Sequence, residues 1–226
     1  MSFEYMPVSL ALTEQPCLVV GGGTIALRKV ETLLDHGAVV TVIAPEVDDK
    51  IAYFGESGKI TLHKRPYEKG EAAKFKYVIS ATDDKELNRQ VSDDSRAGGA
   101  LVNVVDTPSL CDFIFPAVVR RDCLSAAIST DGKAPFMSGH IRQILEEIFP
   151  PHWNKLMKQA VKFRKMVQER WPDDVHMKTV CFTQFIEADW KNLLHEKDKA
   201  VVEEELERML QPREEKPEGQ PPIEME

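Results

Sequence analysis

The first half of the chain alternates short apolar runs with amphipathic segments. Residues 17–20 are continuously apolar and lead into three glycines, which predicts a buried strand followed by a tight turn. Segment 24–36 has apolar residues at helical spacing, so we expect a helix that ends at Gly37. The other elements expected here are strands at 39–43, 59–63, 77–80 and 101–105 and a helix at 84–97. This order predicts a parallel sheet with helices on both faces.

The pattern changes after residue 112. Strand-like runs at 113–120 and 124–129 are separated by only a few residues, with Arg121-Asp122 between them, which predicts a hairpin. The helices expected beyond it span 134–149, 152–171, 178–194 and 197–210, and Pro150-Pro151 marks a boundary. From residue 211 the chain is rich in Pro and Glu with almost no apolar residues, which is typical of a disordered tail.

Charge and composition exclude several classes of protein. The formal net charge is −8, so the chain lacks the basic balance of a nucleic-acid-binding protein. Residues 1–7 have neither the basic nor the apolar region of a signal peptide, and no apolar run is long enough to span a bilayer. We therefore expect a cytoplasmic protein without nucleic-acid or membrane partners. The four cysteines have no metal-ligand spacing, so we expect reduced, structural thiols and no metal site.

The glycines after the first strand fit a dinucleotide-binding motif. Gly21-Gly22-Gly23-Thr24-Ile25-Ala26 matches the pattern G-x-G-x-x-[GA] between an expected strand and an expected helix. Gly21 permits the turn, Gly23 leaves room for a pyrophosphate, and the N-terminus of the helix offers free N–H groups to phosphates. The alternative is a glycine-rich turn without a ligand.

The end of the second strand bears on the choice of dinucleotide. Glu46 lies 20 residues beyond Ala26, where it is placed either to bind the ribose hydroxyls or to be a solvated loop residue. We expect no arginine near this strand end to bind a 2′-phosphate, which favours NAD over NADP.

Five motifs in order resemble the precorrin-2 dehydrogenase family, which also forms the N-terminal part of siroheme synthase. They are residues 21–29 (GGGTIALRK), 40–45 (VTVIAP), 80–84 (SATDD), 103–106 (NVVD) and 127–135 (AISTDGKAP). The resemblance covers roughly residues 8–150 and implies an α/β protein that is a homodimer. The parts it implies are a Rossmann-like NAD-binding domain at 1–112, a strand–helix dimerisation segment at 113–150 and a helical domain at 151–210; the tail at 211–226 is expected from composition.

The resemblance also implies an activity and a set of site residues. Members oxidise precorrin-2 to sirohydrochlorin with NAD as hydride acceptor, and some also insert ferrous iron, acting as sirohydrochlorin ferrochelatases. The residues that would contact the cofactor are Gly21, Gly22, Gly23, Thr24, Ile25, Pro45, Glu46, Thr82 and Asp83. Thr82 and Asp83 follow the strand at 77–80 and would face the cofactor at the carboxyl edge of the sheet.

The reaction also needs a base and a place for the substrate. Asp106 ends the strand at 101–105 and matches the catalytic aspartate of the family; the alternative is a turn aspartate before Thr107-Pro108. Ser129, Thr130 and Lys133 precede the helix at 134–149 and are expected to bind the carboxylates of the tetrapyrrole. Helix capping by the two hydroxyls is the other interpretation, and both roles are compatible.

Three other functions stay open. The first is a bifunctional enzyme that also inserts iron, as the alternative to a dehydrogenase alone. A non-catalytic NAD-sensing module and a scaffold for a haem-pathway complex are the hypotheses from other classes. Asp106 and the loop 129–135 discriminate between them, because a sensor would need neither.

Overall fold

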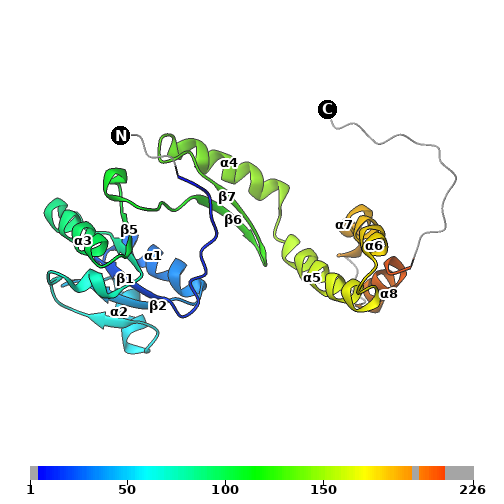
Figure 1. Ribbon diagram of the computed structural model, residues 1–226, viewed down its shortest axis with the longest axis horizontal. Helices are drawn as coiled ribbons and strands as arrows, with labels where there is room; N and C mark the ends of the chain where they lie inside the picture. The colour runs from blue at the N-terminus through cyan, green and yellow to red at the C-terminus, as the bar shows by residue number, and fades with distance from the viewer. Residues whose placement is uncertain (1–4, 195–198, 212–226) are drawn as a thin grey trace. The chain divides into compact units, whose positions relative to one another are not determined.

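The computed structural model describes residues 5–194 and 199–211. The chain folds into two compact units (Figure 1). The first unit contains residues 1–116 and 129–138, and the second contains 117–128 and 139–226. Apart from Gln211, the predicted disordered tail lies outside the described residues.

The first unit is built on a five-stranded parallel sheet. Its strands are β1 (Pro16–Val20), β2 (Val39–Ile43), β3 (Thr61–His63), β4 (Tyr77–Ser80) and β5 (Leu101–Val104). Their order in the sheet is β3-β2-β1-β4-β5, and every neighbouring pair is parallel. The chain reverses its direction of winding between β1 and β4, and ligands bind beyond the carboxyl ends of the strands at such a point. The predicted α/β fold class is confirmed.

Helices cover both faces of this sheet (Figure 1). Helices α1 (Thr24–Asp35) and α2 (Asp49–Glu56) pack on the face that contains Cys17 and Val19. Helix α3 (Lys85–Ala97) packs through Val91 on the opposite face. Successive strand residues therefore enter different cores, which explains why the strands are continuously apolar.

The structure contains one helix and two short 3-10 turns that were not predicted from the sequence. Helix α2 was not predicted; Asp48 caps it by accepting a hydrogen bond from the N–H of Lys50 at 2.9 Å, and Ile51 and Phe54 anchor it in the core. Short 3-10 turns, η1 (Glu71–Lys74) and η2 (Pro108–Leu110), were not predicted either.

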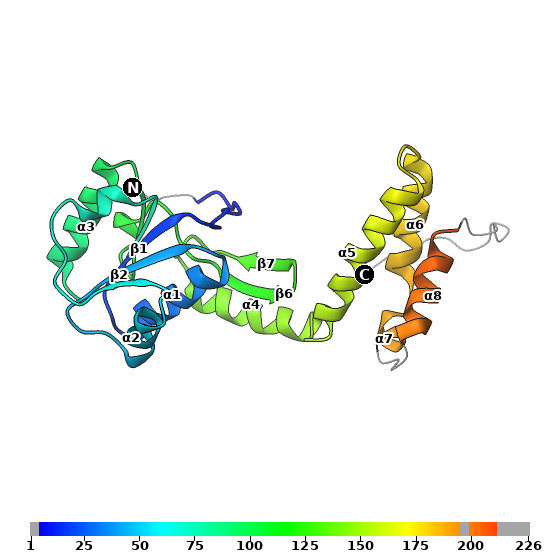
Figure 2. The same ribbon diagram turned by 90° about the horizontal axis from the view of Figure 1, so that it is seen from below.

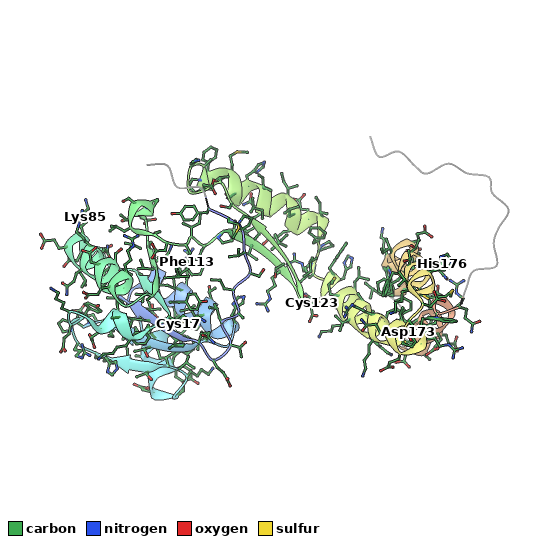
Figure 3. The ribbon with its side chains drawn as sticks, viewed as in Figure 1. Cys17, Lys85, Phe113, Cys123, Asp173 and His176 are labelled. Carbon is green, nitrogen blue, oxygen red and sulfur yellow. The ribbon has the colours of Figure 1, made fainter. Side chains whose placement is uncertain are left out.

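The second unit contains the predicted hairpin of β6 (Ala117–Arg121) and β7 (Leu124–Ile128), which are antiparallel. The turn is formed by Asp122 and Cys123, with Asp122 at a φ of 54°, one residue later than expected. Figure 3 shows Cys123 at the tip of this hairpin. The first strand begins at 117 and not at 113, because Phe113 and Phe115 precede it and pack on the core of the sheet in the first unit.

The rest of the second unit is helical, as predicted (Figure 2). Its helices are α4 (Pro135–Ile148), whose first four residues belong to the first unit, α5 (Trp153–Arg170), α6 (Val175–Glu187), α7 (Trp190–Leu193) and α8 (Lys199–Met209). The single helix expected at 178–194 is two helices, because Ala188 is extended and Asp189 caps α7. The core is aromatic: Phe185 stacks on Phe163 and contacts Trp190.

The cysteines and the helices can be compared with two expectations from the sequence: that the thiols are structural, and that no segment spans a membrane. Cys17, Cys111 and Cys181 are buried and free, and burial raises the pKa of the Cys17 thiol to about 11, which keeps it unreactive. Cys123 is also free, but its exposure corrects the expectation that all four thiols are structural. Within the described part of the chain, no helix has the length and apolar character needed to cross a membrane.

A cap at the start of α3 supports a first prediction. The Asp84 carboxylate accepts hydrogen bonds from the N–H groups of Glu86 at 2.9 Å and Leu87 at 3.0 Å. Asp84→Ala should lower the free energy of unfolding by about 1 kcal/mol, measured by chemical denaturation followed by circular dichroism. The neighbouring Asp83 is exposed, so Asp83→Ala is a matched control. Equal losses in both variants would contradict the role of the cap.

Candidate functional site

The glycine turn between β1 and α1 is shaped by close backbone contacts. Gly21 has a φ of 119°, and a Cβ there would overlap the carbonyl oxygen of Ala81. A Cβ on Gly22 would overlap the carbonyl oxygen of Glu46, because the segment after β2 crosses this turn. The N–H of Asp48 also donates a hydrogen bond to the Gly22 carbonyl at 2.8 Å. Both positions therefore require glycine for reasons internal to the fold.

Gly23 differs from the other two glycines. It is the N-cap residue of α1, its φ is −80°, and a Cβ there would meet no atom within 4 Å. Nothing in the described chain requires glycine at this position, whereas a phosphate approaching the helix N-terminus would. The open space beside Gly23 is therefore compatible with a pyrophosphate group at the start of α1.

A cleft of about 360 Å³ lies at the carboxyl edge of the sheet. Its lining residues are Val20, Gly21, Ile43, Ala44, Pro45, Pro66, Tyr67, Thr82, Asp84, Glu86, Leu87 and Gln90. Of the residues that the sequence assigns to the cofactor, Gly21, Pro45 and Thr82 line this cleft. It opens where β1, β2 and β4 end, as expected for a ligand site in an open parallel sheet.

The other residues assigned to the cofactor lie around the cleft without lining it. Thr24 and Ile25 are exposed on the first turn of α1, and Glu46 and Asp83 are exposed in the loops after β2 and β4. Gly22 and Gly23 belong to the turn itself. Their role in cofactor binding stays a prediction.

Asn88 on α3 orients the end of β4. This buried side chain accepts hydrogen bonds from the hydroxyls of Ser80 at 2.7 Å and Thr82 at 3.0 Å, and it donates to the Thr82 carbonyl at 2.9 Å. The loop after β4 is therefore held in one conformation beside the cleft. The sequence alone does not single out Asn88. The signal that could have found it is its short spacing from the SATDD motif.

Asp106 stands at the carboxyl end of β5. It is exposed and has a φ of 57°, in the left-handed region that few residues other than glycine adopt. Its neighbours anchor it: the N–H of Val105 donates to the Ser80 carbonyl at 2.9 Å, and the N–H of Thr107 donates to the Val104 carbonyl at 3.2 Å. A backbone held in this region often marks a functional position. Asp106 as catalytic base stays a prediction.

Lys29 brings a cation into the neighbourhood of Asp106. It is half-buried on α1, and its Nζ lies 3.7 Å from the centre of the Phe115 ring. Burial, followed by the charge of Arg28, lowers the pKa of Lys29, whereas the negative charge of Asp106 opposes this shift. The sequence suggested no role for Lys29 beyond its place at the end of the first motif.

The loop before α4 is a tight turn in the first unit. Asp131 and Gly132 both have positive φ, and the N–H of Lys133 donates to the Thr130 carbonyl at 2.9 Å. The Thr130 hydroxyl accepts a hydrogen bond from the N–H of Ala134 at 3.1 Å, and the Ser129 hydroxyl accepts one from the N–H of Asp131 at 3.1 Å.

Both hydroxyls of this loop therefore stabilise local structure, which is the capping role. A Cβ on Gly132 would lie 3.9 Å from Pro108, so the loop is close to the segment that follows Asp106. Lys133 is exposed beside it. Binding of substrate by Ser129, Thr130 and Lys133 stays a prediction.

Arg65 corrects the expectation that no arginine is near the end of β2. The N–H of Ala44, just after β2, donates to the His63 carbonyl at 3.2 Å, and Arg65 follows His63 by two residues. The sequence alone does not place Arg65 at this edge, because Arg65 follows β3 and only the pairing of β3 with β2 brings it there.

Across residues 5–194 and 199–211, no cluster of three or more His, Cys, Asp or Glu side chains is arranged to hold a metal ion.

Comparison with known proteins gives one consistent result. Residues 8–117 match the protein-family model described as "Putative NAD(P)-binding". The siroheme synthase of Methylococcus capsulatus (strain Bath) is 39% identical over 170 residues, which is 75% of this chain and 36% of the relative. The siroheme synthase of Pseudomonas putida (strain W619) is 39% identical over 208 residues, 92% of this chain and 44% of the relative.

A solved structure is similar over almost its full length. The structure titled "SirC, precorrin-2 dehydrogenase" has a TM-score of 0.74 and 27% sequence identity, covering 91% of this chain and 98% of that chain. By contrast, this chain spans less than half of the siroheme synthases that it matches. The likeness to SirC therefore covers both units, each with its own core.

Proposed function

The chain belongs to the precorrin-2 dehydrogenase family, and we propose that it oxidises precorrin-2 to sirohydrochlorin with NAD as the hydride acceptor. The observation that carries the proposal is the match to SirC over nearly the whole of both chains. The family resemblance noted on the sequence is thereby confirmed. The pathway is supported by the siroheme synthases, since each contains a region similar to this chain.

A nicotinamide dinucleotide fits the turn and the cleft described above. The N–H groups at the start of α1, beside Gly23, would bind the pyrophosphate, and Thr24 and Ile25 would lie next to it. Pro45 and Glu46 would contact the adenosine end. The cofactor, when bound, supplies the hydride acceptor.

The nicotinamide end belongs at the other side of the switch point. Thr82 and Asp83 follow β4, and Asp106 follows the neighbouring β5, so these residues share the carboxyl edge of the sheet. In this assignment Thr82 and Asp83 position the nicotinamide, and Asp106 lies closest to the reacting carbon.

Asp106 then acts as the general base. Oxidation of precorrin-2 removes two hydrogens, a hydride and a proton; a bound nicotinamide would accept the hydride, and the Asp106 carboxylate is assigned to accept the proton. The Asp106 side chain is exposed, so its carboxylate is accessible to substrate.

The substrate carries many carboxylates, and cations are the groups that bind them. Lys133 and the N-terminus of α4 would hold some of these carboxylates, with Ser129 and Thr130 shaping the loop. The loop lies close to the segment after Asp106, which supports a common site for base and substrate.

A homodimer in the cytoplasm is the proposed form of the protein. A two-stranded sheet is only marginally stable by itself, and Val118 on β6 is 44% exposed. Ile144 and Ile148 on α4 are also exposed, at 43% and 56%. Burial of these apolar side chains against a second copy would stabilise both.

The test is anaerobic spectroscopy of the purified chain with precorrin-2 and NAD. The expected result is simultaneous formation of NADH and sirohydrochlorin, at a rate proportional to the concentration of protein. Ferrous iron is then added as a substrate; a spectral change faster than in protein-free solution would add ferrochelatase activity. NAD binding without any turnover would contradict the enzyme hypothesis and favour an NAD-sensing module.

A further inference from the structure

An arginine and a glutamate are paired beside the adenosine end of the cleft. The Arg65 guanidinium donates two hydrogen bonds to the Glu71 carboxylate, at 2.9 Å and 2.5 Å. It donates a third to the Pro66 carbonyl at 3.0 Å, and Pro66 lines the cleft. The guanidinium is thus next to the cleft wall, with its fork occupied by a carboxylate.

Residues at this place select the dinucleotide in parallel-sheet folds of this type. The adenosine ribose lies beyond the second strand, and an arginine there binds the 2′-phosphate of NADP. Guanidinium groups bind phosphate and carboxylate through the same two-pronged geometry. Glu71 therefore occupies the donors that a 2′-phosphate would need.

The glutamate is held in place by its own surroundings. Its carboxylate also accepts a hydrogen bond from the N–H of Glu68 at 2.8 Å, and its side chain is 17% exposed. The adjacent backbone is fixed as well, because the Tyr67 hydroxyl donates to Asp94 at 2.8 Å and accepts from the N–H of Ala72 at 3.0 Å. Partial burial reduces the screening of this ion pair by solvent.

We propose that the Arg65–Glu71 pair determines cofactor specificity: Glu71 neutralises Arg65, so that the cleft accepts the 2′-hydroxyl of NAD and disfavours the 2′-phosphate of NADP. This inference rests on the proposed dinucleotide site. Binding of NADP would require Arg65 to leave Glu71, and the freed carboxylate would then repel the phosphate.

The titration behaviour of the pair agrees with this assignment. The hydrogen bond to Glu71 raises the pKa of Arg65, and the hydrogen bond from Arg65 lowers the pKa of Glu71. Both groups are therefore charged at neutral pH, and a phosphate meets a preformed ion pair.

The experiment measures Kd values for NAD and NADP by titration calorimetry, without substrate, on the wild type and on Glu71→Gln. The glutamine keeps the shape and an acceptor for the Glu68 N–H but removes the charge. We expect the wild type to prefer NAD. In Glu71→Gln, NADP affinity should rise about tenfold or more, while NAD affinity stays within about threefold, because only the 2′-phosphate would use the charged hydrogen-bond donors that Arg65 then has free.

Two further variants separate the pair from a general change of charge. Glu68→Gln removes the same charge from the same loop, but Glu68 is 74% exposed and approaches Arg65 only to 3.7 Å. It should leave the ratio of the two Kd values nearly unchanged. Arg65→Ala combined with Glu71→Gln should abolish the gain in NADP affinity, whereas Arg65→Ala alone should not weaken NADP binding.

Each contrary outcome is distinguishable. An equal gain in Glu68→Gln and Glu71→Gln, or a weaker affinity for NADP in Arg65→Ala alone, would overturn the specificity assignment while leaving the dinucleotide site intact. If the wild type binds neither NAD nor NADP, the proposed cofactor site itself fails, and the specificity assignment fails with it. Melting temperatures verify that every variant is folded.

Discussion

Asp106→Asn is expected to lower the rate of precorrin-2 oxidation by about 10²–10⁴-fold, the range for loss of a general base. The amide has the size of the carboxylate but does not accept the proton that leaves with the hydride. Asparagine also tolerates the φ of 57° at this position, so the fold should be preserved. Affinity for NAD should change little, because the carboxylate is assigned to the substrate.

The measurement is NADH formation under anaerobic conditions, together with the Kd for NAD. Asp122→Asn is the matched control, because Asp122 has a nearly identical φ of 54° but lies in the hairpin turn between β6 and β7. The control should keep wild-type activity. If Asp106→Asn retains activity within a few-fold of wild type, Asp106 is a turn residue and the base lies elsewhere.

Gly21→Ala is expected to destabilise the α/β unit by about 3 kcal/mol, from backbone strain and overpacking together. The new methyl group would overlap the Ala81 carbonyl oxygen, and the φ of 119° disfavours any residue with a side chain. Neither the turn nor β4 can move easily, since Val20 and Ser80 are paired in the centre of the sheet.

Gly23→Ala is the matched comparison, two residues further along the same turn. No atom lies within 4 Å of the place that the new methyl group would take, so the stability of this variant should stay within about 0.5 kcal/mol of wild type. Its NAD affinity should nevertheless fall by about tenfold, which corresponds to about 1.4 kcal/mol. Chemical denaturation and calorimetric titration measure the two effects. Unaltered NAD affinity in Gly23→Ala would argue against the pyrophosphate at this turn.

Most of the elements in the α/β unit were predictable, because their signals are local and agree with one another. The strand at 17–20, the glycines and the helix that ends at Gly37 follow each other without a gap, and each supports the next. Helix α2 was missed because it is only eight residues long and depends on the Asp48 cap. The break at Ala188 was missed because the apolar pattern continues across it.

The parts of the candidate site that directly follow a strand were predictable from the sequence. Residues directly after β1, β2, β4 and β5 could be assigned to one edge of the sheet from the sequence, because parallel strands bring their carboxyl ends together. Arg65 and Asn88 were not, since neither stands in a recognisable motif. Their importance comes from partners across the sheet: Glu71 for Arg65, and the hydroxyls of Ser80 and Thr82 for Asn88.

The order and type of the strands and helices, the glycine turn and the family resemblance all follow from the linear chain. They rest on the periodicity of apolar residues and on the backbone freedom of glycine, both of which are properties of short segments. Strand order, the left-handed backbone of Asp106, the approach of Lys29 to it and the pairing of Arg65 with Glu71 emerge only in the folded molecule. Each depends on contacts between segments that are distant along the chain or on a turn conformation that packing imposes, and apolar periodicity carries no information about either.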